Sequence, residues 1–187
     1  FEQYFKNSAM LVMDHPESGN TLLEITRVLA DKQFRDMKRS YCKNPIVNQF
    51  WEAAEKTTGE QGLQNFVPYI SSKFDPLISN EFLRPIVTQE TSVINMRDIM
   101  DNKKILLVNL SKGMLGELNA NLLGMILVMK IQMAALSRAD SYGQKLADFY
   151  LYIDEFQNVT TPAISSILSE ARKYRLSINM AHQFMAQ

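Results

Sequence analysis

Apolar residues in the second half of the chain gather in short continuous runs rather than at helical spacing. Lys104–Leu110 and Phe149–Ile153 are rich in β-favouring side chains, and polar residues follow each run at once. Such runs are typical of strands buried on both faces of a parallel sheet. A shorter apolar run, Ser177–Ala181, predicts a third strand.

Two helices are predicted between these three strands. Leu115–Ala139 is long and apolar around most of its circumference, and a second helix is expected from about Pro162 to Tyr174. Strands that alternate with helices in this way indicate a parallel α/β sheet. We therefore expect residues 91–187 to form an α/β domain.

The first ninety residues show helical spacing without strand alternation. Helices are expected over Thr21–Ala30, from Asp31 to about Tyr41, from Asn44-Pro45 onward, and over Gln64–Ile78. Thr21 and Glu24 form a capping box, and Asp31 and Asn44 are of the residue types that cap helix N-termini. Residues 1–90 are therefore predicted to be an all-α helical bundle.

Composition and charge exclude several classes of protein. Hydrophobic residues make up 46% of the 187 residues and charged residues 21%, which is typical of a globular protein with a core. Cys42 is the single cysteine, so an internal disulfide is excluded and a reducing, cytoplasmic compartment is indicated. The apolar run Leu122–Leu136 is interrupted by Lys130 and Gln132, and no transmembrane segment or signal peptide is expected.

One stretch departs from the even distribution of charge. Between residues 27 and 43, two acids, Asp31 and Asp36, face the six cations Arg27, Lys32, Arg35, Lys38, Arg39 and Lys43. Such a helix could contact phosphates. The alternative, a solvated helix face, is the commoner origin of such a run and is favoured here.

The strongest chemical signal is the pair of acids that ends the run Phe149–Ile153. Asp154 and Glu155 would lie at the carboxyl end of a buried strand, where open α/β sheets bind ligands. This is the layout of a Walker B strand, in which Asp154 would hold Mg²⁺ through water and Glu155 would polarise the water that attacks ATP. The alternative is an acidic pair that begins a solvated loop or caps a helix.

A second strand ends in a residue that could sense nucleotide. Gln183 follows Ser177–Ala181, and its amide could donate to a phosphoryl oxygen and accept from the attacking water. Arg172 lies in a cationic stretch that either complements the helix dipole or supplies an arginine finger to a neighbouring subunit. His182 is interpreted as structural, because only His15 accompanies it and no ligand spacing is present.

One expected element is missing from the sequence. No G-x-x-x-x-G-K-[ST] phosphate-binding loop occurs, and Ser111-Lys112-Gly113 has a single glycine in the wrong order. The chain is therefore expected to be an internal piece of a larger protein, with its phosphate loop before Phe1. By itself it should bind ATP poorly and should not hydrolyse it.

These segments together resemble a known family. Ile105–Gly113, Leu151–Gln157, Ser169–Leu176 and Ala181-His182-Gln183 are similar to the VirD4/TraG/TraD-type conjugative coupling proteins of type IV secretion, within the HerA/FtsK group of P-loop DNA translocases. The helical segment Leu22–Trp51 also resembles that family.

The resemblance implies a RecA-like P-loop NTPase core preceded by an inserted all-α domain. It implies Asp154 and Glu155 as the Walker B pair, Gln183 as the sensor and Arg172 as a candidate trans finger, with ATP and Mg²⁺ as cofactors. A hexameric ring that threads DNA is implied, with a relaxase or secretion-channel proteins as further partners. A missing N-terminal anchor would place the parent protein on the cytoplasmic face of the inner membrane.

Two other functions stay open at this stage. One is a soluble HerA-like translocase that serves DNA processing. The other is a non-hydrolysing scaffold, in which the helical half docks DNA or a partner protein. A phosphate loop upstream of Phe1 would support a motor, and upstream transmembrane helices would favour secretion.

Overall fold

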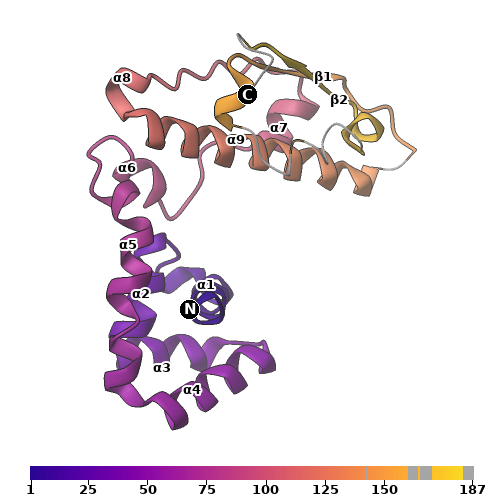
Figure 1. The fold of residues 1–187 in the computed structure, drawn as a ribbon. Helices are drawn as coiled ribbons and strands as arrows, with labels where there is room; N and C mark the ends of the chain where they lie inside the picture. The colour runs from indigo at the N-terminus through magenta and orange to yellow at the C-terminus, as the bar shows by residue number, and fades with distance from the viewer. Residues whose placement is uncertain (142, 160–163, 165–169, 183–187) are drawn as a thin grey trace. The chain divides into compact units, whose positions relative to one another are not determined.

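The computed structural model describes residues 1–141, 143–159, 164 and 170–182. The chain divides into two compact units, the helical unit Phe1–Ser92 and the α/β unit Val93–Gln187. The first unit contains helices and the second combines helices with a parallel sheet (Figure 1). Each unit is described separately below.

The helical unit is built from short helices whose ends are set by their capping residues. Its elements are α1 Glu2–Asp14, a 3₁₀ turn Pro16–Ser18, α2 Leu22–Ala30, α3 Lys32–Tyr41, α4 Pro45–Gln64, α5 Val67–Ile78 and α6 Arg84–Val87. The capping box of Thr21 and Glu24 is present, with the Thr21 amide donating to Glu24 Oε2 over 2.8 Å. Asp31 accepts from the Phe34 amide, a bond that holds the pKa of this carboxyl below its usual value. Asn44 caps α4 by accepting from the Ile46 amide over 3.0 Å, so all three predicted caps are confirmed.

Helix α4 bends at Gly59, where the backbone has a φ of 65° and a ψ of 173°. Positive φ is costly for residues with a Cβ, so glycine suits this position. The kink turns the end of α4 toward α5. The helical unit thereby closes around a core that includes the fully buried side chains Leu11, Val28, Leu29, Val47, Trp51 and Leu63.

Two cations of the basic stretch are fully buried in this unit. The Arg35 guanidinium donates from Nε to Glu55 Oε1 over 2.9 Å, from Nη1 to the Val28 carbonyl over 2.9 Å, and from Nη2 to Glu60. Lys38 Nζ donates to three backbone carbonyls, those of Val12 at 3.3 Å, His15 at 2.7 Å and Gly19 at 2.6 Å. Burial lowers the pKa of Lys38.

These contacts correct both interpretations for two of the six cations, whereas Arg27, Lys32 and Lys43 are exposed, as the solvated-face interpretation predicts. Arg35 and Lys38 are 0% exposed, so they neither reach a phosphate nor form a solvated face. Arg39 pairs with Glu55 over 2.8 Å, and Lys32 pairs with Asp36 over 2.7 Å. For Arg35 the sequence pattern was misleading, because the carboxylates of α4 that pair with it, those of Glu55 and Glu60, lie 20 and 25 residues away in the chain.

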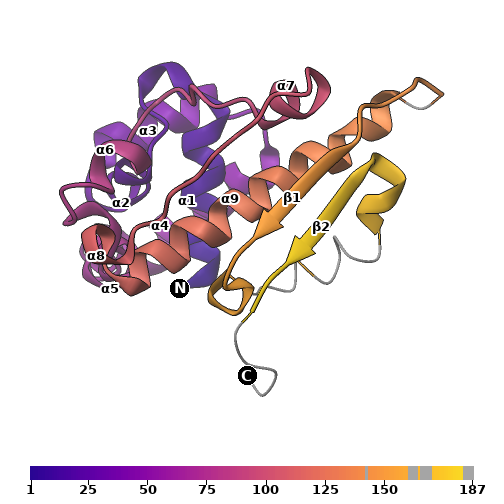
Figure 2. The same cartoon turned by 90° about the horizontal axis from the view of Figure 1, so that it is seen from above.

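The α/β unit places a two-stranded parallel sheet on one long helix. Its elements are α7 Met96–Asp101, α8 Lys112–Leu115, α9 Glu117–Ser137, a 3₁₀ turn η2 Arg138–Ser141, β1 Phe149–Ile153, η3 Phe156–Val159, η4 Ala171–Tyr174 and β2 Leu176–Met180. Strand β1 pairs with β2 in parallel, with Phe149 opposite Leu176 and Ile153 opposite Met180. Figure 2 shows the two strands side by side along α9.

One face of the sheet forms the core of the α/β unit. Leu176 and the half-buried Phe149, Leu151 and Ile153 pack with Val128 and Ile131 of α9. Gly124 allows η3 to approach the same helix, since a Cβ at this position would lie 2.5 Å from Val159 Cγ1. The predicted α/β class with a parallel sheet is therefore present in this unit.

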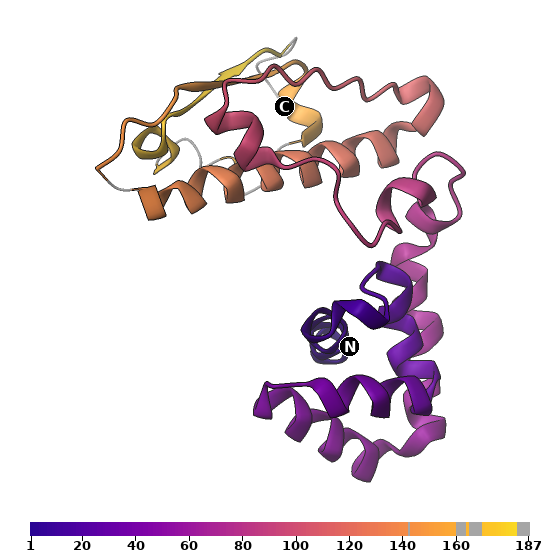
Figure 3. The same cartoon turned by 180° about the vertical axis from the view of Figure 1, so that it is seen from behind.

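The prediction that Lys104–Leu110 forms a strand is wrong. This segment runs extended from α7 to α8 but makes no strand ladder with a described residue (Figure 3). Ile105 and Leu107 are 88% and 90% exposed, whereas Leu106 packs on the core. A run of apolar residues becomes a strand only when a neighbouring strand supplies backbone partners, and β1 lies across a cavity from this segment.

The expectation that β1 is buried on both faces is also wrong. Tyr150 and Tyr152 are 57% and 74% exposed, so β1 alternates between a covered and an open face. The helix expected from Pro162 to Tyr174 falls largely on residues outside the described part. Its end, Ala171–Tyr174, is a 3₁₀ turn.

Helix α9 ends close to where the sequence predicted, and the chain continues through η2 to Ser141. Among the described residues, the stretch Glu117–Ser141 has the length and the apolar composition of a helix that could cross a membrane. The core helix of a soluble protein passes the same test. Here the helix buries Gly124, Val128, Ile131 and Ala135 in its own unit.

The buried ammonium of Lys38 gives a test of the helical unit. We expect Lys38→Met to lower the free energy of unfolding by about 2–4 kcal/mol, because three buried carbonyls lose their charged donor. Lys32→Met is the matched control in the same helix, where an exposed ion pair is worth less than about 1 kcal/mol. Urea unfolding of both variants measures the difference, and equal losses would contradict the structural role of Lys38.

Candidate functional site

The carboxyl ends of β1 and β2 lie side by side, and hydrogen bonds connect the two segments that follow them. The Ala181 amide donates to the Ile153 carbonyl over 2.9 Å, and the Phe156 amide donates to the Ala181 carbonyl over 3.1 Å. The rings of Phe156 and His182 pack edge to face, with centroids 5.4 Å apart. The two strand ends that the sequence singled out are therefore adjacent, which is where open α/β sheets bind ligands.

Asp154 and Glu155 are locked into this turn by local hydrogen bonds. The Glu155 amide donates to Asp154 Oδ1 over 3.0 Å, and Asn158 Nδ2 donates to Glu155 Oε2 over 3.0 Å. Glu155 has a φ of 49°, in the left-handed region that few residues other than glycine adopt. Asp154 is exposed and Glu155 half-buried, so the two carboxylates differ in environment although they are neighbours in sequence.

Lys112 is a member of this site that the sequence analysis did not identify. Its ammonium lies 3.6 Å from Glu155 Oε2 and 3.4 Å from Glu117 Oε1. Lys112 opens α8, directly after the extended segment 104–110, so it approaches Glu155 from a different part of the chain. The sequence could have indicated Lys112, because it follows directly after an apolar run. The ends of such runs gather at one edge of an α/β unit.

A cavity of about 930 Å³ lies beside these charged groups. Segment 103–110, one side of α9 and strand β1 line it, and Lys112, Asp154 and Glu155 are at its polar part. Apolar cavities with a few converging polar groups are typical of ligand sites. The cavity therefore gives the acidic turn a binding space within its own unit.

The described residues contain no group of three or more His, Cys, Asp or Glu side chains that could hold a metal ion. Mg²⁺ is commonly held by only one or two carboxylates together with phosphate oxygens. The exposed carboxylate of Asp154 fits that donor set. Metal binding at this turn would therefore depend on a phosphate ligand.

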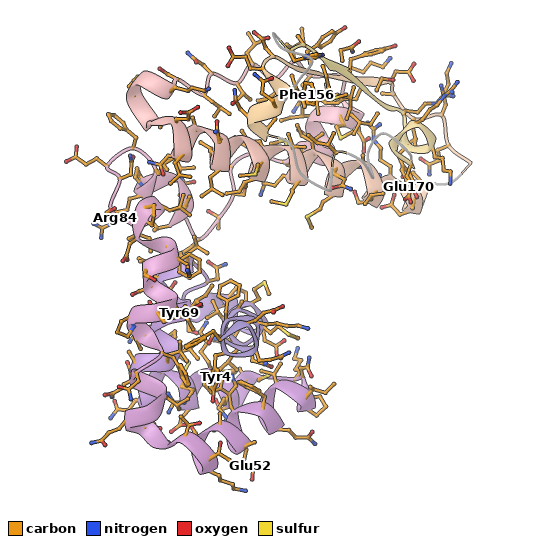
Figure 4. The ribbon with its side chains drawn as sticks, in the orientation of Figure 1. Tyr4, Glu52, Tyr69, Arg84, Phe156 and Glu170 are labelled. Carbon is orange, nitrogen blue, oxygen red and sulfur yellow. The ribbon has the colours of Figure 1, made fainter. Side chains whose placement is uncertain are left out.

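The structure does not bring Arg172 to the acidic turn of its own unit. Arg172 is exposed in η4, just before β2, whereas Asp154 and Glu155 follow the end of β1. Five paired residues separate the two ends of the sheet, roughly 16 Å at the rise of a strand. Phe156 and Glu170 mark these opposite ends in Figure 4. Any contact of Arg172 with the acids would require a second subunit.

Gln183 lies outside the described residues, which end at His182 in this region. The position of its side chain therefore stays a prediction. The preceding residues Ala181 and His182 are next to Phe156, so the chain approaches the acidic turn from the end of β2.

Comparison of the chain with protein-family models, with curated proteins and with solved structures found no match.

The backbone at Glu155 gives a stability test of the turn. Glu155→Gly is expected to be more stable than Glu155→Ala by about 1 kcal/mol, because glycine accepts a φ of 49° without a steric penalty. At Glu117, in the first turn of α9, the order should reverse by up to about 1 kcal/mol in favour of alanine. Chemical unfolding of the four variants tests this, and alanine being preferred at both positions would refute the turn geometry.

Proposed function

We propose that this chain is part of an ATP-driven DNA-translocating motor of the type IV secretion coupling class, with a RecA-like core. The observation that carries the proposal is the meeting of two parallel strand ends beside the pair Asp154 and Glu155. This arrangement supports a Walker B assignment, because nucleotides bind at the carboxyl ends of parallel strands. The resemblance of these segments to VirD4/TraG/TraD-type proteins supports the choice of motor.

In this proposal the two acids have separate tasks. Asp154, which is exposed, would hold Mg²⁺ through water once nucleotide phosphates complete the ligand set. Mg²⁺ would neutralise charge on the phosphates. Glu155, held by Asn158 and Lys112, would orient and polarise the attacking water.

Lys112 is assigned a positioning role toward Glu155. Its ammonium and the Asn158 amide engage the Oε2 atom of the same carboxylate, and this restricts the directions in which Glu155 can point. A preorganised acid requires less rearrangement at the moment of reaction. Lys112 also pairs with Glu117, so the lysine links the acidic turn to the start of α9.

The remaining assignments complete the proposed motor. Gln183 would sense the terminal phosphate, and Arg172 would act across a subunit interface in a hexameric ring around DNA. A relaxase or channel proteins would be further partners, on the cytoplasmic face of the inner membrane. Arg172 precedes β2, whereas Glu155 follows the end of β1, so the two residues lie toward opposite ends of the sheet. This separation within one subunit supports a trans role for Arg172.

The test is ATP hydrolysis by the full-length protein that contains this chain, with and without DNA. Glu155→Gln is expected to bind ATP normally and to lose about 100-fold or more in turnover, because the amide cannot accept the proton of water. The matched control is Glu117→Gln, which changes another acidic partner of Lys112 and should keep at least half of the turnover.

The outcomes separate the alternatives. DNA-stimulated turnover that depends on Glu155 supports the motor. Turnover that Glu155→Gln leaves unchanged removes Glu155 from the mechanism. A folded protein that hydrolyses no ATP under either condition would identify a non-hydrolysing scaffold, and association with DNA-processing rather than secretion proteins would favour the soluble HerA-like translocase.

A further inference from the structure

A second cavity lies at the opposite end of the sheet from the acidic turn. Its volume is about 440 Å³, and the 3₁₀ turn η2, the loop before β1 and η4 line it. Four of its lining residues are cations: Arg138, Lys145, Lys173 and Arg175. Among the described residues that line it, none is Asp or Glu. We call this cavity the cationic pocket.

Arg138 is the buried centre of the cationic pocket. Its side chain is 0% exposed, and Nε donates to Asp101 Oδ1 over 2.9 Å. Its Nη1 atom donates to the carbonyls of Ala147 and Tyr174 over 3.0 Å and 2.9 Å. These three bonds fix the guanidinium between the start of β1 and the residue that leads into β2.

The remaining nitrogen of Arg138, Nη2, has no hydrogen-bond partner among the described residues. It is covered by protein atoms, so a ligand oxygen in the cavity cannot reach it. Contacts with a ligand therefore fall to the exposed cations of the pocket.

The charges around the pocket define the class of ligand. Asp101 neutralises Arg138, and Asp148 lies 3.4 Å from Arg175. Lys145 and Lys173 are exposed and make no ion pair with a described residue. Two exposed ammonium groups that make no ion pair with a described residue match the charge of a phosphate group.

We propose that the cationic pocket is a phosphate-binding site, distinct from the acidic turn at the other end of β1. Its ligand is either a phosphorylated small molecule or the phosphodiester backbone of a nucleic acid. The two sources share the same recognition chemistry, in which the exposed ammonium groups of Lys145 and Lys173 contact and neutralise the anion. The proposal does not depend on ATP hydrolysis at Glu155.

The experiment titrates the 187-residue chain with two probes at about 50 mM salt, where phosphate contacts are strong. Inorganic pyrophosphate is followed by calorimetry, and a short fluorescent single-stranded DNA is followed by anisotropy. Lys145→Ala/Lys173→Ala is expected to weaken binding by about tenfold or more, because two charge-assisted contacts are lost. The matched control, Lys6→Ala/Lys130→Ala, removes two exposed lysines elsewhere and should change binding less than about twofold.

Lys145→Arg/Lys173→Arg provides a second variant, since it keeps both positive charges of the pocket. We expect it to bind both probes within about twofold of the unmodified chain, and a loss as large as that of the alanine variant would contradict recognition by these charges. Pyrophosphate that displaces the DNA identifies a backbone phosphate site, and pyrophosphate binding alone identifies a small phosphorylated ligand. The absence of binding to both probes, or equal losses in the control, would overturn the proposal.

Lys112→Ala separates this site from the proposed motor site, because Lys112 is the cation beside Glu155 at the acidic turn. The variant should bind both probes as the unmodified chain does, since the cationic pocket lies at the other end of the sheet. A loss of probe binding in Lys112→Ala would show that the phosphate binds at the acidic turn, and this would overturn the cationic pocket.

Discussion

The parallel pairing of β1 with β2 is the constraint on which the α/β unit depends. Five residues on each strand are in register, and their inner side chains pack on α9. Because the strands run in the same direction, both carboxyl ends reach one edge and both amino ends reach the other. One edge consequently gathers Asp154 and Glu155, while the other gathers the cations around Arg138.

The two edges differ in how their charges are compensated. At the acidic turn, Glu155 is held by a lysine and an amide that approach from separate segments, and the carboxylates remain half-buried or exposed. At the cationic pocket, the central guanidinium is fully buried, and its Nη2 has no partner among the described residues. The first arrangement suits a group that must exchange ligands, whereas in the second the exposed lysines are the groups that can meet an anion.

The helical unit uses cations for a different purpose. Arg35 and Lys38 are buried. Arg35 donates to a carboxylate of α4, and Lys38 donates to backbone carbonyls. Buried charges of this kind cost desolvation free energy, which their ion pairs and hydrogen bonds offset. Arg35 and Lys38 therefore stabilise the helical unit by connecting segments that are distant in the sequence. A basic pattern in a sequence does not by itself indicate a surface that binds nucleic acid.

The sequence alone determined the local features: the helix caps at Thr21 and Asp31, the strand Phe149–Ile153, and the acids that follow it. These features depend on residues that are neighbours in the sequence, so the order of residue types is enough to predict them. Tertiary structure decided the rest. It left Lys104–Leu110 without a strand partner in the described part of the chain, buried Arg35 and Lys38, and brought Lys112 to Glu155. Hydrogen-bond ladders and ion pairs between distant segments depend on packing, which no local pattern encodes.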